Sequence, residues 1–169
     1  MYRKNSIKDT MMELKDVFQN SAIELMSVMF NIQITINDTW EIADSSDARY
    51  DYIFSQISEN KQYKSYVIIG AAYPVLEKIL GPNISLDEAK DAFGEFANCY
   101  HAVLMDNPTF VAQFGYLVQK VPEDSTILAC FPMAWGIQGK INFQHEELFI
   151  RFSMEEKKFG DDILAFLDE

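Results

Sequence analysis

The sequence has few basic residues and no long apolar segment. Its 14 lysines and arginines are outnumbered by 26 aspartates and glutamates, which gives a formal net charge of −12 at pH 7. This charge repels the phosphates of nucleic acids and of anionic membrane surfaces, so we expect neither as a partner. No apolar run approaches the roughly 20 residues that a membrane-spanning helix needs, and no secretion signal is visible. We therefore expect a cytoplasmic protein.

Motifs that mark several enzyme classes are also missing. The chain has no G-x-S-x-G elbow, no Walker-type loop and no G-x-G-x-x-G, which gives serine hydrolase, NTPase and dinucleotide-dependent activities no footing. Gly136 and Gly139 are predicted only to mark a turn. The nearest approach to a metal-ligand cluster is His145-Glu146-Glu147, which lacks the spacing of a metal motif and is predicted to be an exposed loop or turn. We expect no metal site and, from the isolated Cys99 and Cys130, no disulfide.

A substantial hydrophobic core, by contrast, is available. With 49% hydrophobic residues the chain is long enough to bury one, and its length predicts a single domain over residues 1–169. Hydrophobic periodicity and turn residues then divide it into helices and strands. The predicted elements are an amphipathic helix from about Ser6 to Phe30, a strand at Ile32–Ile36, a surface loop at Trp40–Asp51, a hairpin of strands Tyr52–Ser58 and Gln62–Ala71, a short helix at Tyr73–Leu80, a long helix at Ser85–Asn107, strands at Phe114–Lys120, Thr126–Phe131, Ile137–Phe143 and Glu147–Ser153, and a closing helical turn at Phe159–Leu167.

The second long helix is the most informative segment. Ser85 and Glu88 have the spacing of a capping box, which marks its start. Apolar residues recur at helical spacing along one side and predict a buried face. The members of this face are Ala89, Ala92, Phe93, Phe96, Ala97, Tyr100, Val103 and Leu104.

The opposite side of this helix carries three polar residues. At about 100° per residue, Asp91, Glu95 and Asn98 fall within roughly 60° of one another. On pattern alone, such a side is most simply the solvated face of an amphipathic helix. A surface that contacts a partner is the competing interpretation, and periodicity does not decide between the two.

A resemblance to a known family favours the partner surface. The signature Asp/Ser-x3-Glu-x2-Asn of the CheC/CheX/FliY family of chemotaxis phosphatases is similar to the run Asp91-Ala92-Phe93-Gly94-Glu95-Phe96-Ala97-Asn98. In that family the Glu and Asn lie on a long helix preceded by a strand, a shorter helix and a turn, as Tyr66 to Pro82 are predicted to supply here. The resemblance covers most of the chain. It implies an α+β, CheC-like fold in which two long helices pack on a mainly antiparallel β-sheet.

The resemblance also implies a phosphatase that acts on the aspartyl phosphate of a CheY-type response regulator. Asn98 would align the hydrolytic water, since its carbonyl accepts from water while its amide donates toward a phosphoryl oxygen. Glu95 would pair with a lysine of the receiver. Asp91, at the periphery, and His101 are the candidates for further partner contacts, with a merely solvated ring as the alternative for His101. The Mg²⁺ of the reaction is expected in the phosphorylated receiver, so no cofactor of the chain's own is implied.

The two halves of the chain are each predicted to be a long helix followed by strands, which suggests a diverged internal repeat like that of the family. The first helix offers Asn20, Glu24 and Ser27 and so lacks the required asparagine. A single competent helix is more like CheX, and this likeness implies one site per chain and a homodimer formed through the sheet.

Two other functions stay open. A non-enzymatic CheC-like interaction or dimerisation module in a signalling or flagellar complex would use the same surface. A small-ligand domain would use the aromatic residues, 13 Phe and 8 Tyr, to line a pocket between helices and sheet, although most of these rings are expected in the core.

Overall fold

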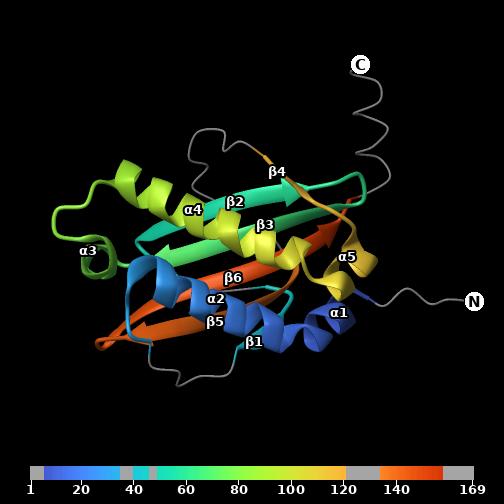
Figure 1. Ribbon diagram of the computed structural model, residues 1–169, viewed down its shortest axis with the longest axis horizontal. Coiled ribbons are helices and arrows are strands. Elements are labelled where there is room, and N and C mark those ends of the chain that lie inside the picture. Colours follow the sequence, from blue (N-terminus) through green and yellow to red (C-terminus); the bar gives the residue numbers. More distant parts are fainter. Residues whose placement is uncertain (1–5, 35–39, 46–48, 121–133, 158–169) are drawn as a thin grey trace, which may run out of the picture.

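The computed structural model describes residues 6–34, 40–45, 49–120 and 134–157, which form a mixed α+β structure (Figure 1). Its helices are α1 (Ile7–Glu13), α2 (Lys15–Phe30), α3 (Tyr73–Leu80), α4 (Leu86–Met105) and α5 (Pro108–Phe114). Its strands are β1 (Glu41–Ala43), β2 (Tyr52–Glu59), β3 (Tyr63–Ala71), β4 (Val118–Gln119), β5 (Trp135–Phe143) and β6 (Glu146–Glu156). The predicted fold class is confirmed. The strand predicted at Thr126–Phe131, the closing turn at Phe159–Leu167 and Cys130 lie outside the described residues.

The described strands form one antiparallel sheet in the order β1-β5-β6-β3-β2-β4. Its centre consists of two hairpins, β2 with β3 and β5 with β6, which meet through the pairing of β3 with β6. The sheet is symmetric in its topology. Followed from its other edge, the order is β4-β2-β3-β6-β5-β1, which is the same order with β1, β2 and β3 in the places of β4, β5 and β6 and the reverse. Because α2 precedes the first set of strands and α4 the second, the topology matches the predicted helix-plus-strands repeat.

The helices cover one face of the sheet, with α4 beside β2 and α2 beside β5 (Figure 1). Alternate residues of the two central strands point into this layer, and the pairs Val67–Phe152 and Ile69–Ile150 are buried in it. Phe18 of α2 lies fully buried above them, with its ring centroid 4.9 Å from that of Phe152. No helix in the described part of the chain is long and apolar enough to span a membrane.

The first long helix, predicted from about Ser6 to Phe30, is in fact two helices joined at Leu14. This residue has φ −97° and ψ 10°, outside the range of an α-helix, yet only 5% of it is exposed. The backbone hydrogen bonds from Leu14 N to Thr10 O and from Phe18 N to Leu14 O continue across the junction. The break is therefore a bend that keeps the apolar sides of both α1 and α2 on the core.

Two predictions for the segment before the first hairpin are wrong. Residues 32–34 of the predicted strand Ile32–Ile36 have no regular structure, and the rest of that strand is not described. The predicted surface loop at Trp40–Asp51 contains the edge strand β1, and Trp40 is buried at 1% exposure. A Cβ on Gly139 would overlap the Trp40 indole, so the missing side chain makes room for the ring. Gly136 and Gly139 accordingly lie within β5 and not in the turn predicted for them.

The strand predicted at Phe114–Lys120 is also wrong in its greater part. The side chain of Asn107 accepts from the backbone N of Phe110 at 3.0 Å, and Pro108 occupies the first turn of α5. The Asn-Pro pair, which follows the predicted long helix, thus begins another helix. Strand structure is left only at β4, on the edge of the sheet.

Candidate functional site

The helix that carries the predicted site begins as the sequence indicates. Ser85 Oγ accepts from the backbone N of Glu88 at 3.1 Å, and Glu88 Oε2 accepts from the backbone N of Ser85 at 3.3 Å. This capping box satisfies two donors that otherwise lack partners at a helix start. The helix then runs from Leu86 to Met105, two residues short of the predicted end.

The inner face of α4 is fixed to both the sheet and α2. The ring centroid of Phe93 lies 5.0 Å from that of Phe54 in β2 and 5.8 Å from that of Phe30 in α2. The hydroxyl of Tyr100 donates to the backbone O of Phe18 in α2 at 2.8 Å. Burial raises the pKa of Tyr100 well above its ordinary value of 10, so the hydroxyl keeps the proton that it donates. These contacts make α4 a rigid support for its outer face.

The outer face of α4 carries Asp91, Glu95 and Asn98, which we call the polar ridge. All three residues are exposed. Their side chains have no hydrogen-bond or ion-pair partner among the residues that the structure describes, whereas Glu88, on the same helix, is engaged in the capping box. Residues three and four apart on a helix have Cβ atoms about 5–6 Å apart. The polar ridge can therefore contact one partner with three unengaged side chains.

His101 lies beside the polar ridge and is partly buried. Burial lowers the pKa of His101 below its ordinary value of 6.5, and a hydrogen bond to the backbone of Leu117 offsets part of this effect. The ring is therefore neutral at pH 7. Leu117 belongs to the segment that leads into β4, so His101 connects α4 to the edge of the sheet. Its contact with a partner stays a prediction.

Known structures share this architecture, although no family model matches the sequence and no curated protein is similar to it. The chemotaxis protein CheX of Vibrio vulnificus has a TM-score of 0.57 at 18% identity, over 85% of this chain and 99% of the CheX chain. A CheC-like chemotactic protein of Shewanella oneidensis has a TM-score of 0.58 at 17% identity, over 85% and 99%. A Desulfovibrio vulgaris Hildenborough protein, provisionally named a chemotaxis protein, has 0.61 at 16% identity, over 85% and 97%.

This chain has a CheC/CheX-like fold. The fold type that the sequence motif implied is thereby confirmed. At these identities the likeness concerns the fold alone. The same fold occurs in FliM of Helicobacter pylori, in the structure of its complex with SpeE, with a TM-score of 0.57 at 9% identity over 88% of this chain and 89% of the FliM chain.

The other long helix of the CheC/CheX-like fold, α2, carries no equivalent of the polar ridge. Asn20 and Glu24 are exposed. Ser27 follows Glu24 at the spacing at which Asn98 follows Glu95, and its hydroxyl donates to the backbone O of Ile32 at 3.2 Å. In the described part of the chain, α4 thus has the one helix face that matches the motif.

The cluster His145-Glu146-Glu147 is divided between a turn and a strand. Gln144 and His145 have φ values of 47° and 63°, as in the two-residue turn of a hairpin, and they connect β5 to β6. Glu146 forms an ion pair with Lys78 at 3.0 Å. The predicted turn is confirmed at His145. Nowhere in the described residues do three or more His, Cys, Asp or Glu side chains gather as a metal site would require.

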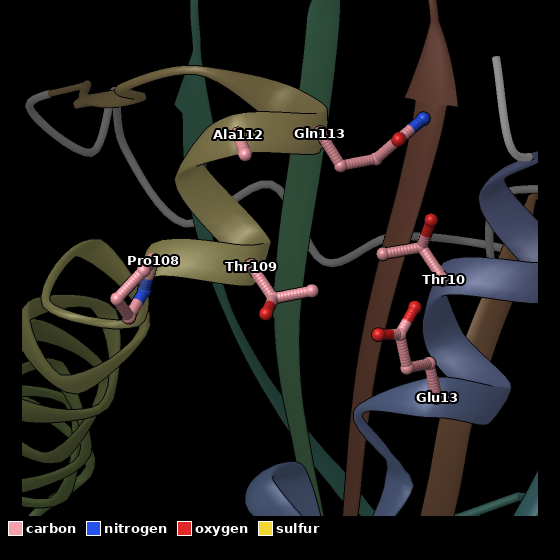
Figure 2. A pocket seen from close by; sticks show the side chains of 6 residues that line it. All are labelled: Thr10, Glu13, Pro108, Thr109, Ala112 and Gln113. Carbon is pink, nitrogen blue, oxygen red and sulfur yellow. The ribbon is translucent and has the colours of Figure 1, made fainter.

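An open groove of about 370 Å³ lies between α1 and α5 (Figure 2). It is lined by Thr10, Glu13, Pro108, Thr109, Ala112 and Gln113. None of the predicted site residues lines this groove, and neither does any aromatic ring. Rings such as Phe18, Phe110 and Phe152 are buried in the core instead. The groove therefore gives no support to the interpretation of the aromatic residues as the lining of a ligand pocket.

Proposed function

We propose that this protein is a phosphatase for the aspartyl phosphate of a CheY-type receiver, and that the polar ridge of α4 enters the receiver's active site. The observation that carries the proposal is the ridge. Glu95 and Asn98 have the spacing of the family signature, stand exposed on a capped helix, and have no partner in the described part of the chain. The CheC/CheX-like fold supports the proposal, because the motif lies on one of its two long helices.

The proposed reaction uses a positioned water as its nucleophile and needs no nucleophilic side chain from this protein. Water attacks the phosphorus, the bond from phosphorus to the aspartyl oxygen breaks, the carboxylate leaves, and the protons of the water remain on inorganic phosphate and solvent. The Asn98 carbonyl would accept a hydrogen bond from the attacking water, and its amide would donate to a phosphoryl oxygen. Because α4 is fixed to the core, the backbone that carries the carboxamide is in place before the partner arrives.

Glu95 is assigned to recognition of the receiver. It lies one turn before Asn98 and would fix the docking register by pairing with a lysine of the receiver. The helix carries four acidic residues, Asp87, Glu88, Asp91 and Glu95, against one lysine, Lys90. This excess of negative charge favours a partner whose rim is basic and speeds their encounter. Asp91 would contact that rim.

The test is the decay of a phosphorylated CheY-type receiver in the presence of Mg²⁺, with and without this protein. We expect the intact protein to speed the decay. Asn98→Ala should lower the maximal rate about 100-fold or more, the cost of removing one preorganised group at a reacting centre, and leave the half-saturating receiver concentration unchanged. Glu95→Ala should raise that concentration about tenfold or more. Asn20→Ala, at an exposed asparagine of α2, is the matched control and should behave as the intact protein does.

A second candidate function is a non-enzymatic interaction module, which the occurrence of the fold in the FliM–SpeE complex favours. Such a module would bind its partner through the polar ridge without changing the decay. Binding of the receiver with no faster decay, across several receivers, would reject the phosphatase and leave the module. Full activity of Asn98→Ala would instead show that Asn98 takes no part in the reaction.

A further inference from the structure

Gly94 is a glycine inside α4 that no contact among the described residues explains. It lies in the interior of a helix of 20 residues, where only proline is less favourable than glycine. It is not among the residues with positive φ, and a Cβ built on it would meet no heavy atom of the described residues within 4 Å. Alanine would therefore fit the folded chain at this position and would favour the helix.

The glycines of β5 show the opposite situation. A Cβ on Gly136 would lie 2.6 Å from the backbone O of Phe152, and a Cβ on Gly139 would overlap the Trp40 indole. At these two positions the packing of the chain itself requires glycine. At Gly94 the packing of the described residues does not require glycine, which directs attention to a contact with a partner.

Gly94 borders the polar ridge on the outer face of α4. Gly94 lies three residues after Asp91, directly before Glu95 and four residues before Asn98. Side chains on a helix lean toward its N-terminus, so the Asn98 carboxamide lies over the turn that contains Gly94. A side chain at position 94 would stand next to that carboxamide. Glycine leaves a notch there, in which the backbone of α4 is open to a partner.

We infer that Gly94 is a positioning residue, and that its notch admits the phosphorylated loop of the receiver against the backbone of α4. This inference rests on the proposed function. Asn98 has a short side chain, so its carboxamide reaches the water and the phosphoryl group only if the two backbones approach closely. A displacement of about 1 Å in such an arrangement can lower a rate about 100-fold. A methyl group at position 94 would impose part of such a displacement, and a glutamine side chain would impose all of it.

The test compares Gly94→Ala and Gly94→Gln with Ala112→Gln, which adds the same side chain at an exposed position of α5. Gly94→Ala should raise the melting temperature by about 2–4 °C, because alanine favours the helix. The rate of receiver decay at low protein concentration should nevertheless fall about tenfold for Gly94→Ala and about 100-fold for Gly94→Gln. Ala112→Gln should keep the rate of the intact protein.

Opposite changes in stability and activity distinguish a docking role from a structural one. If the intact protein speeds decay and both Gly94 variants do so equally well, the inference is overturned and the proposed function stands. If Gly94→Ala lowers the melting temperature together with the rate, Gly94 is structural and the inference is again overturned. If the intact protein does not change the decay of any receiver, the proposed function fails and the inference fails with it.

Discussion

Arg151 is a single residue that holds three segments together. It lies in β6 between Ile150 and Phe152, which face the helices, so its own side chain points to the other face of the sheet. The side chain is fully buried. Its guanidinium donates to Gln138 Oε1 in β5 at 2.8 Å and to two backbone oxygens, those of Ala43 at 3.2 Å and Ala134 at 2.5 Å.

We expect Arg151→Met to lower the free energy of unfolding by about 3 kcal/mol, because buried acceptors without donors cost about 1–3 kcal/mol each. Lys140→Met is the matched control, since Lys140 is an exposed cation of the adjacent strand whose pair with Glu147, at 3.3 Å, is exposed as well. Its effect should be about 0.5 kcal/mol or less. Urea unfolding of both variants measures the difference, and equal effects would contradict the role given to Arg151.

The spacing of residues on one helix was enough to predict the exposure of Glu95 and Asn98. On a single helix, the angle between two side chains depends only on their separation in the sequence. The surroundings of His101 and Trp40 could not be predicted in this way, because Leu117 and Gly139, their respective neighbours, come from other elements. Contacts between elements were therefore not predictable, whereas the exposed face of α4, which lies within one element, was predicted.

At the scale of elements, Glu59 connects three strand ends. This residue of β2 forms ion pairs with Lys120, just after β4, at 2.7 Å and with Lys157, just after β6, at 3.4 Å. Burial raises the pKa of Glu59, but the hydrogen bonds and charges of the two lysines outweigh it, and the pKa lies below its ordinary value of 4.5. A lowered pKa in the folded state means that the ionised form stabilises the fold.

The stabilisation by Glu59 should therefore be present above its ordinary pKa of 4.5 and disappear as the pH falls through the lowered value of the folded state. We expect Glu59→Gln to lower the free energy of unfolding by about 1 kcal/mol at neutral pH, near the upper end for pairs at a surface. The difference from the intact protein should shrink steadily below about pH 4. Urea unfolding at several pH values tests this, and a difference independent of pH would show that the ion pairs are not its cause.

Elements with several agreeing signals were predicted well, and short elements were not. α3 and α4 each have a start signal, an amphipathic stripe and an end, and the structure places them within two residues of the predicted bounds. α5 has seven residues, too few for a helical period to stand out. The alternation at Ile32–Ile36 predicted a strand, but residues 32–34 pair with no strand of the described sheet.

At the scale of the whole molecule, the order of the strands was beyond the reach of local patterns. β3 and β6 pair at the centre of the sheet, with Tyr63 opposite Glu156. The residues of neither strand indicate which other strand it pairs with. The likeness of the two halves could be predicted, because it lies in the order of helix and strands and not in residue identity. The homodimer through the sheet stays a prediction, which the molar mass in solution will test.

The topology is symmetric, but only α4 carries a polar ridge in the described part of the chain. We therefore predict that each chain binds one receiver. On α2, Ser27 replaces the asparagine, is shorter than a carboxamide, and already donates its hydroxyl to Ile32. Glu24→Ala should therefore leave the decay rate unchanged, although Glu24, like Glu95, is an exposed carboxylate on a helix. Calorimetric titration should give one receiver bound per chain. A second bound receiver, or Glu24→Ala weakening the binding as Glu95→Ala does, would show that α2 carries a site of its own and that the asparagine is not what defines one.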